Sequence, residues 1–189
     1  MKTLLTLFVL FFSSSVIADD ISEFKIEGIS IGDSLLEHMS ENEIIKNMTD
    51  VYHYIDEKKF IATGFFSKDL TYDFDVIQVT LKINDNKYKV YGVGGNITSI
   101  DPTECLIKQK EIDNDINDNF SDFKKSGPVT IPHPVDNGKS VVYQISYTLN
   151  KGVVVLIECY DFSNAVPYKD SFVLSLYSDE LNRWLQKYQ

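Results

Sequence analysis

The stretch Val141-Val142-Tyr143-Gln144-Ile145-Ser146-Tyr147-Thr148 decides the fold, together with the apolar run from Val153 to Cys159 that follows it. In the first run, positions 141, 143, 145 and 147 hold large apolar or aromatic residues, which is the period of a β-strand. Asn150-Lys151-Gly152 supplies turn residues between the two runs. The pattern predicts an antiparallel hairpin, and the alternation at Phe172, Leu174 and Leu176 predicts a third strand beside it.

The same period occurs earlier in the chain. Val79, Leu81 and Ile83 alternate with polar residues, and turn residues stand at Ser67-Lys68-Asp69 and Asn84-Asp85-Asn86. This pattern predicts a second antiparallel meander with strands at about 60–66, 72–83 and 87–93.

A long helix is predicted between the two strand regions. Asp101-Pro102-Thr103-Glu104 combines an N-cap Asp, a Pro at the first helical position and a Glu that completes a capping box. The helix should run over 102–125, with Lys124-Lys125 near its C-terminal dipole and Gly127-Pro128 ending it. Val129 to Pro134 is then expected to be a loop. An apolar stripe should face the core through Ile112, Ile116, Phe120 and Phe123.

Shorter helices are predicted near both ends of the chain. Asp33 or Ser34 can accept the first N–H groups of a broken helix pair over 34–48, whose second part starts with a capping box at Ser40. Ser178 is expected to cap a final helix. The fold class is therefore α+β, with helices packed on a predominantly antiparallel sheet. Helix-then-three-strands occurs twice, which suggests halves at 19–100 and 101–189 within a single domain of residues 19–189.

The first 18 residues predict a cleavable signal peptide. Lys2 precedes an apolar stretch from Leu4 to Phe12, and Ser13-Ser14-Ser15 and Val16-Ile17-Ala18 follow it. The stretch is too short to span a bilayer, which takes about 20 apolar residues. No cysteine follows it to carry a lipid anchor, so we expect a soluble mature chain that starts at Asp19 and lies in the periplasm or outside the cell.

Loss of Lys2 takes the formal charge from −10 to −11. An acidic surface repels phosphates and anionic lipids, so we expect no nucleic-acid partner and no membrane anchor. Because an exported chain meets an oxidising compartment, its only two cysteines, Cys105 and Cys159, are predicted to form a disulfide.

One motif suggests hydrolysis. Gly32-Asp33-Ser34-Leu35 resembles the opening signature of the GDSL esterases, which implies Ser34 as nucleophile, and Asp50-Val51-Tyr52-His53 matches that family's D-x-x-H, which implies His53 as its base. In that family the D-x-x-H block lies near the C-terminus, whereas here it lies early, and residues 52–100 predict consecutive antiparallel strands instead of a parallel sheet. Helix capping is the favoured role of these residues, and the hydrolase is an alternative.

Other motifs favour neither a cofactor nor a metal. Residues 113–118 place oxygen ligands at alternate positions, but Asp118 replaces the required Gly of a calcium loop and Lys124 replaces its Glu. Gly138-Lys139-Ser140 lacks the first Gly of a phosphate loop and precedes a strand. We therefore predict no catalytic, cofactor or metal residues.

Four stretches carry a resemblance: residues 26–34, Glu104-Cys105, His133-Pro134-Val135-Asp136 with 138–140, and Cys159-Tyr160-Asp161-Phe162-Ser163. Together they resemble a family of small exported proteins from marine Pelagibacter-type alphaproteobacteria. The resemblance implies a bacterial periplasm and a low-GC genome, and it implies no particular activity. The order of elements is also similar to SmpA/OmlA-like envelope domains and the β-lactamase-inhibitor-like fold, which is a likeness of architecture alone.

The leading hypothesis is an exported soluble binding or interaction module with a protein or small-molecule partner. Two alternatives remain open, the Ser34 hydrolase and a structural component of the cell envelope.

Overall fold

A computed structural model describes residues 24–53, 55–66, 74–120 and 123–188. The predicted signal peptide, residues 1–18, lies outside the described residues, as do the predicted turn at 67–69 and the first two residues of the strand predicted at 72–83.

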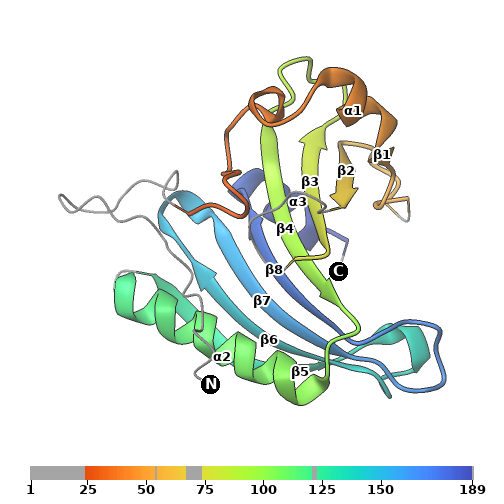
Figure 1. Ribbon diagram of the computed structural model, residues 1–189, viewed down its shortest axis with the longest axis vertical. Helices are drawn as coiled ribbons and strands as arrows, with labels where there is room; N and C mark the ends of the chain where they lie inside the picture. The colour runs from red at the N-terminus through yellow and green to blue at the C-terminus, as the bar shows by residue number, and fades with distance from the viewer. Residues whose placement is uncertain (1–23, 54, 67–73, 121–122, 189) are drawn as a thin grey trace, which may run out of the picture.

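Eight strands form one antiparallel sheet in the order β1-β2-β3-β4-β8-β7-β6-β5 (Figure 1). The strands are β1 Met48–Thr49, β2 Phe60–Phe66, β3 Val76–Lys82, β4 Val90–Thr98, β5 Lys124–Pro132, β6 Val141–Thr148, β7 Val154–Asp161 and β8 Ser171–Tyr177. The antiparallel sheet and the α+β class are confirmed. The predicted hairpin is β6 and β7, whose register pairs Ile145 with Ile157.

The helices are α1 Glu41–Lys46, α2 Pro102–Asn119 and α3 Asp179–Gln186, with short 3₁₀ turns η2 Leu35–Glu37, η3 Pro134–Asp136 and η4 Asn150–Gly152. The predicted N-caps are confirmed for all three α-helices, because Ser40, Asp101 and Ser178 each accept backbone N–H groups of the first turn. No helix among the described residues is long and apolar enough to cross a membrane.

The predicted end of the long helix is wrong. α2 stops at Asn119, and Lys124–Pro132, predicted as helix end and loop, forms the edge strand β5. The free edge of β6 offers backbone partners to this segment, and the register shifts between Ser126 and Val129, so Gly127-Pro128 sits in the irregularity of the ladder. A proline is tolerated at a bulge on an edge strand because no ladder hydrogen bond is required of it there.

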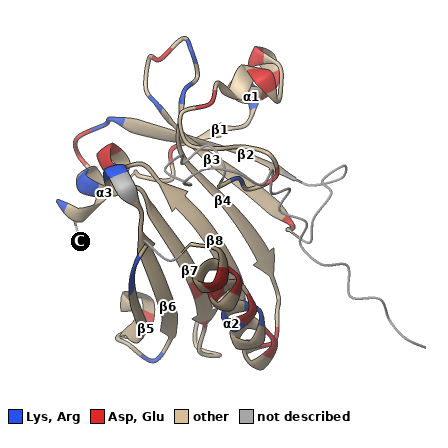
Figure 2. Cartoon of the chain, turned by 90° about the vertical axis from the view of Figure 1, so that its left-hand side faces the viewer, with Lys and Arg blue, Asp and Glu red and all other residues tan. Residues whose placement is uncertain are grey.

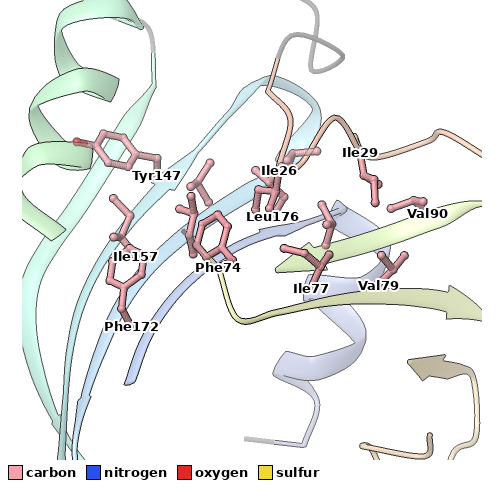
Figure 3. Close-up of a cluster of buried hydrophobic side chains, with 14 of the residues drawn as sticks. Ile26, Ile29, Phe74, Ile77, Val79, Val90, Tyr147, Ile157, Phe172 and Leu176 are labelled. Atoms are coloured by element: carbon pink, nitrogen blue, oxygen red, sulfur yellow. The ribbon is translucent and has the colours of Figure 1, made fainter. Parts of the chain in front are cut away.

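The main core lies on one face of the sheet, covered at one end by α2 and at the other by the segment that carries Ile26 and Ile29 (Figure 3). Phe172, Leu174 and Leu176 of β8 point into it, and Ile116 and the partly buried Ile112 of α2 pack against it. The buried Gln109 of α2 donates to strand carbonyls at 2.8 Å. On the side that faces the sheet, α2 is buried and hydrogen-bonded, and its exposed acidic residues lie on its outer side (Figure 2).

The predicted pairing of Cys105 with Cys159 is confirmed. It joins α2 to β7, with Cα atoms 5.9 Å apart and no free cysteine among the described residues. The bond therefore fastens the long helix to the centre of the sheet it covers.

A second, smaller core lies on the opposite face. Leu181 and Trp184 of α3 pack there with Tyr52, Ile55 and Phe60. Gly92 of β4 makes room for α3, since a Cβ at this position would lie 2.6 Å from Leu181 Cδ2. Helices α2 and α3 therefore cover opposite faces of the sheet (Figures 1 and 2).

Candidate functional site

A cavity of about 290 Å³ opens on the sheet face that carries α3. It extends over β3, β4 and β8 and reaches the end of β7; its lining residues are Tyr52, Gln78, Thr80, Val93, Gly94, Asn96, Tyr160, Phe162, Ser171, Val173, Ser175 and Tyr177. The set contains amide, hydroxyl and aromatic groups and no charged side chain. Such a concave surface with a few polar groups is typical of small-molecule sites.

Small residues make the floor of this cavity. Gly94 pairs with Ser175 across β4 and β8, and a Cβ at Gly94 would lie 2.9 Å from Ser175 Oγ. Two residues further along the same two strands, Val173 of β8 pairs with Asn96 of β4. The sheet is therefore hollowed where these small side chains meet.

Aromatic side chains surround the floor. The Tyr52 hydroxyl lies 2.9 Å from the Thr80 hydroxyl, which fixes the Tyr52 ring beside β3. At the other end, Tyr160 and Phe162 stack with ring centroids 5.8 Å apart. The Phe162 N–H donates to Asp170 Oδ1 at 2.7 Å, so the aromatic wall is held by its own loop.

A hydrogen-bond network ties the two loops beneath this wall. Asp136 accepts from the Ser140 N–H at 2.9 Å, the Ser140 hydroxyl at 2.7 Å and the Ser163 hydroxyl at 2.5 Å. Burial acts to raise the pKa of Asp136, but these hydrogen bonds outweigh it and lower the pKa to about 2. The loop after β5 and the loop after β7 are thereby fastened to each other next to Phe162.

Asn96 presents an unsatisfied acceptor at this site. Its Oδ1 is buried and has no hydrogen-bond partner among the described residues. Buried polar atoms are normally hydrogen-bonded, so an acceptor left open in a cavity calls for a donor from outside the chain.

Glu158 of β7 is not a lining residue itself, but it is the neighbour of two lining residues, Val173 and Tyr160. It pairs with Val173 of β8, and Val173 pairs with Asn96 of β4 on its other side, so Glu158 and Asn96 flank one residue of the floor. The Tyr160 hydroxyl donates to Glu158 Oε2 at 3.4 Å. Burial raises the pKa of Glu158 to about 7, and the weak Tyr160 hydrogen bond only partly offsets that effect. No salt bridge to Glu158 occurs within the described ranges.

The residues of the hydrolase alternative have other surroundings. The Ser34 hydroxyl donates to the Lys87 carbonyl at 2.8 Å, so its proton is directed to the backbone. Leu35, beside Ser34, belongs to the main core, whereas Tyr52, beside the exposed His53, belongs to the cluster on the opposite face. The expected cap by Asp33 or Ser34 is wrong: Ser34 makes no cap bond, and Asp33 Oδ2 accepts from the Ser30 N–H at 2.8 Å.

The other motifs also have structural roles. Asp113 pairs with Lys125 and accepts from the Tyr147 hydroxyl, which joins α2 to the strands. Ser140 is fully buried against Asp136. Groups of three or more metal-ligating residues are absent from the described part of the chain.

Sequence reasoning did not bring the residues of the cavity together. Gly94-Gly95-Asn96 resembles the oxyanion block of the GDSL esterases, but that likeness gave no relation of Gly94 and Asn96 to Ser175 or Glu158. These residues come from three different strands, and only the sheet register brings them close to one another. A local signal for Glu158 is its place as a charged residue inside the otherwise apolar run from Val153 to Cys159.

Comparisons of the chain with protein-family models, with curated proteins and with solved structures find no match.

Proposed function

We propose that the protein is an exported soluble binding module that holds a small ligand on the sheet face opposite α2. The cavity of about 290 Å³ over β3, β4 and β8 carries this proposal. Three features support it: a floor of small residues, aromatic walls, and an open buried acceptor on Asn96. Larger apolar side chains in the place of Gly94 and Ser175 would fill this cavity and gain stability from burial.

The proposed location is the periplasm or the medium. The signal-peptide pattern of residues 1–18 supports it, and so does the disulfide geometry of Cys105 and Cys159. N-terminal sequencing of the protein recovered from the periplasmic fraction of an expression host should start at Asp19. Recovery only from the cytoplasm with Met1 intact would contradict export.

Binding is tested with the exported protein labelled with ¹⁵N and a library of small fragments observed by NMR. Fragments that bind should shift the backbone signals of Asn96, Tyr160 and Ser175. The Gly94→Val variant should abolish these shifts, because its side chain fills the floor beside Ser175.

The matched control is Gly64→Val. Gly64 lies in β2 beside Gln78, and a Cβ there meets only one atom, at 3.8 Å. This variant should keep the fragment-induced shifts. If no fragment shifts the cavity signals, or if Gly94→Val leaves the shifts unchanged, the proposed function is wrong.

We also propose that residues 19–100 and 101–189 are related halves. The strand order supports this, since β1 to β4 and β5 to β8 are each contiguous and meet at β4 and β8. Each half has four strands, not the three expected, because β1 and β5 were not predicted as strands. The two fragments, expressed separately and mixed, should reassemble through the β4–β8 pairing; failure to do so would contradict the proposal.

A further inference from the structure

Two acceptors near the cavity have no cationic partner among the described residues, and the one donor to Glu158 is the long contact from the Tyr160 hydroxyl, at 3.4 Å. Glu158 forms no salt bridge in the described residues, and Asn96 Oδ1 accepts no hydrogen bond there. Both flank Val173 in one row across β7, β8 and β4. Neighbouring strands lie about 4.8 Å apart, so the Cα atoms of Glu158 and Asn96, which lie on either side of β8, are about 10 Å from each other. Their side chains lie on the same face of the sheet.

We propose that the cavity binds a small molecule bearing a protonated primary amine, whose ammonium group lies above Val173 and donates to both Glu158 and Asn96. This inference rests on the proposed function and names its ligand class. An ammonium group carries three donors, so it can satisfy the carboxylate and the amide oxygen together.

The surroundings favour a cation over an anion. No Lys or Arg lines the cavity, and the whole chain has a formal charge of −10. The walls are aromatic, with Tyr160 and Phe162 at one end and Tyr52 at the other. Aromatic faces attract cations and also pack against the apolar body of a ligand. A neutral polyol satisfies the hydroxyl groups equally well but leaves the half-buried Glu158 without a counter-charge.

The inference has a pH consequence. Because burial raises the pKa of Glu158 to about 7, the carboxyl group is largely protonated in mildly acidic solution and cannot pair with an ammonium group. Amine affinity should therefore rise as the pH increases through 7. The groups around Glu158 are Gln144 of β6, Val173 of β8 and Tyr160 of its own strand.

Two further titratable groups lie near Tyr160. Burial raises the pKa of Tyr160 most, and the neighbouring Glu158 and Tyr177 of β8 raise it further. The Tyr160 hydroxyl therefore stays neutral across the tested pH range. The second is His133, whose ring centroid lies 6.1 Å from that of Tyr160. A His133→Gln variant should keep the pH dependence of amine binding, which separates the effect of His133 from that of Glu158.

The experiment compares benzylamine with benzyl alcohol, which have nearly the same shape but differ in charge. NMR titrations at pH 8 should give benzylamine an affinity at least about ten-fold higher than that of benzyl alcohol, as expected for one charge-assisted contact. At pH 5.5 the difference should shrink to less than about three-fold. Acetyl-lysine methylamide, which presents the same ammonium on a peptide unit, distinguishes a free amine from a lysine side chain as the natural source.

Glu158→Gln keeps the shape and removes the charge, and it should abolish the preference for benzylamine. The matched control is Glu111→Gln, the same change at an exposed position of α2 on the other face. Asn96→Ala should weaken amine binding without removing its pH dependence.

The possible failures are distinguishable. Equal affinity for the amine and the alcohol, or an unchanged preference in Glu158→Gln, overturns the amine inference and leaves the binding function in place. If other fragments bind in the cavity and neither benzylamine nor benzyl alcohol does, the amine inference is overturned and the binding function stays in place. Only the absence of any fragment binding there overturns both proposals.

Discussion

The two faces of the sheet are built from the same strands with opposite consequences. In β8, Phe172, Leu174 and Leu176 point into the core under α2, and the alternate residues Ser171, Val173 and Ser175 line the cavity. The first face is filled with large apolar side chains. The second combines small residues with the half-buried carboxylate of Glu158. One face is therefore closely packed, and the other leaves a cavity open to solvent.

The sharpest way to test this difference uses two adjacent residues. Phe172→Ala should lower the free energy of unfolding by about 4 kcal/mol, because Phe172 is fully buried and its removal leaves a cavity in the core. Val173→Ala, one residue further on the opposite face, should cost less than about 1 kcal/mol because a cavity already exists there. Urea denaturation measures both. Equal losses would contradict the distinction between the faces.

The disulfide belongs to the closely packed face, and its removal should cost about 3 kcal/mol. Cys105 and Cys159 are 54 residues apart, so the bond restricts a long loop in the unfolded chain. The double variant Cys105→Ala/Cys159→Ala should unfold at lower urea concentration, and reduced wild-type protein should behave like it. Thiol titration of the unfolded, unreduced protein should detect no free cysteine, and finding two would refute the bond.

On the cavity face, Glu158 should make stability depend on pH. Its folded-state pKa is about 7, above the ordinary value of 4.5, so the folded state holds the proton more tightly. Its contribution to stability is complete below pH 4.5 and is lost as the pH rises through 7. Glu158→Gln should remove this loss and be more stable than wild type at pH 8 by about 2 kcal/mol.

Thermal unfolding of wild type and Glu158→Gln from pH 4 to pH 8 measures the effect as a difference. Glu111→Gln, on the exposed side of α2, should follow the wild-type curve. Parallel curves for wild type and Glu158→Gln would show that Glu158 ionises normally, and would remove one support of the amine inference.

Local sequence signals predicted most of the helices and strands. Asp101 and Ser178 cap the first turns of their own helices, and the alternation of β6 and β8 lies within each strand. Such short-range signals can be recognised in the sequence without knowledge of the fold. The failure at Lys124–Pro132 has a tertiary cause, since this segment is a strand only because β6 offers it a free edge. A Gly-Pro pair is compatible both with the end of a helix and with an irregularity in an edge strand, so it could not distinguish the two structures.

The cavity face could not be predicted in the same way. Asn96 and Glu158 are 62 positions apart in the chain, and they flank Val173 only because β4 and β7 both pair with β8. The pairing of distant strands depends on the whole sheet. The GDSL motif shows the converse: Ser34 and His53 match a local pattern, but their neighbours pack on opposite faces.

The smallest effect should come from the surface of α3, which shares the cavity face. Arg183 pairs with Asp179 one turn earlier, and the Arg183 side chain is 71% exposed. Solvent screens such a pair, so Arg183→Ala should change the free energy of unfolding by less than about 0.5 kcal/mol. Leu181→Ala, two residues earlier and fully buried against Gly92 and the second core, should cost about 3 kcal/mol by the same measurement. If Arg183→Ala proved as damaging as Leu181→Ala, the stability of α3 would depend on the ion pair within the helix as much as on its apolar packing against the sheet.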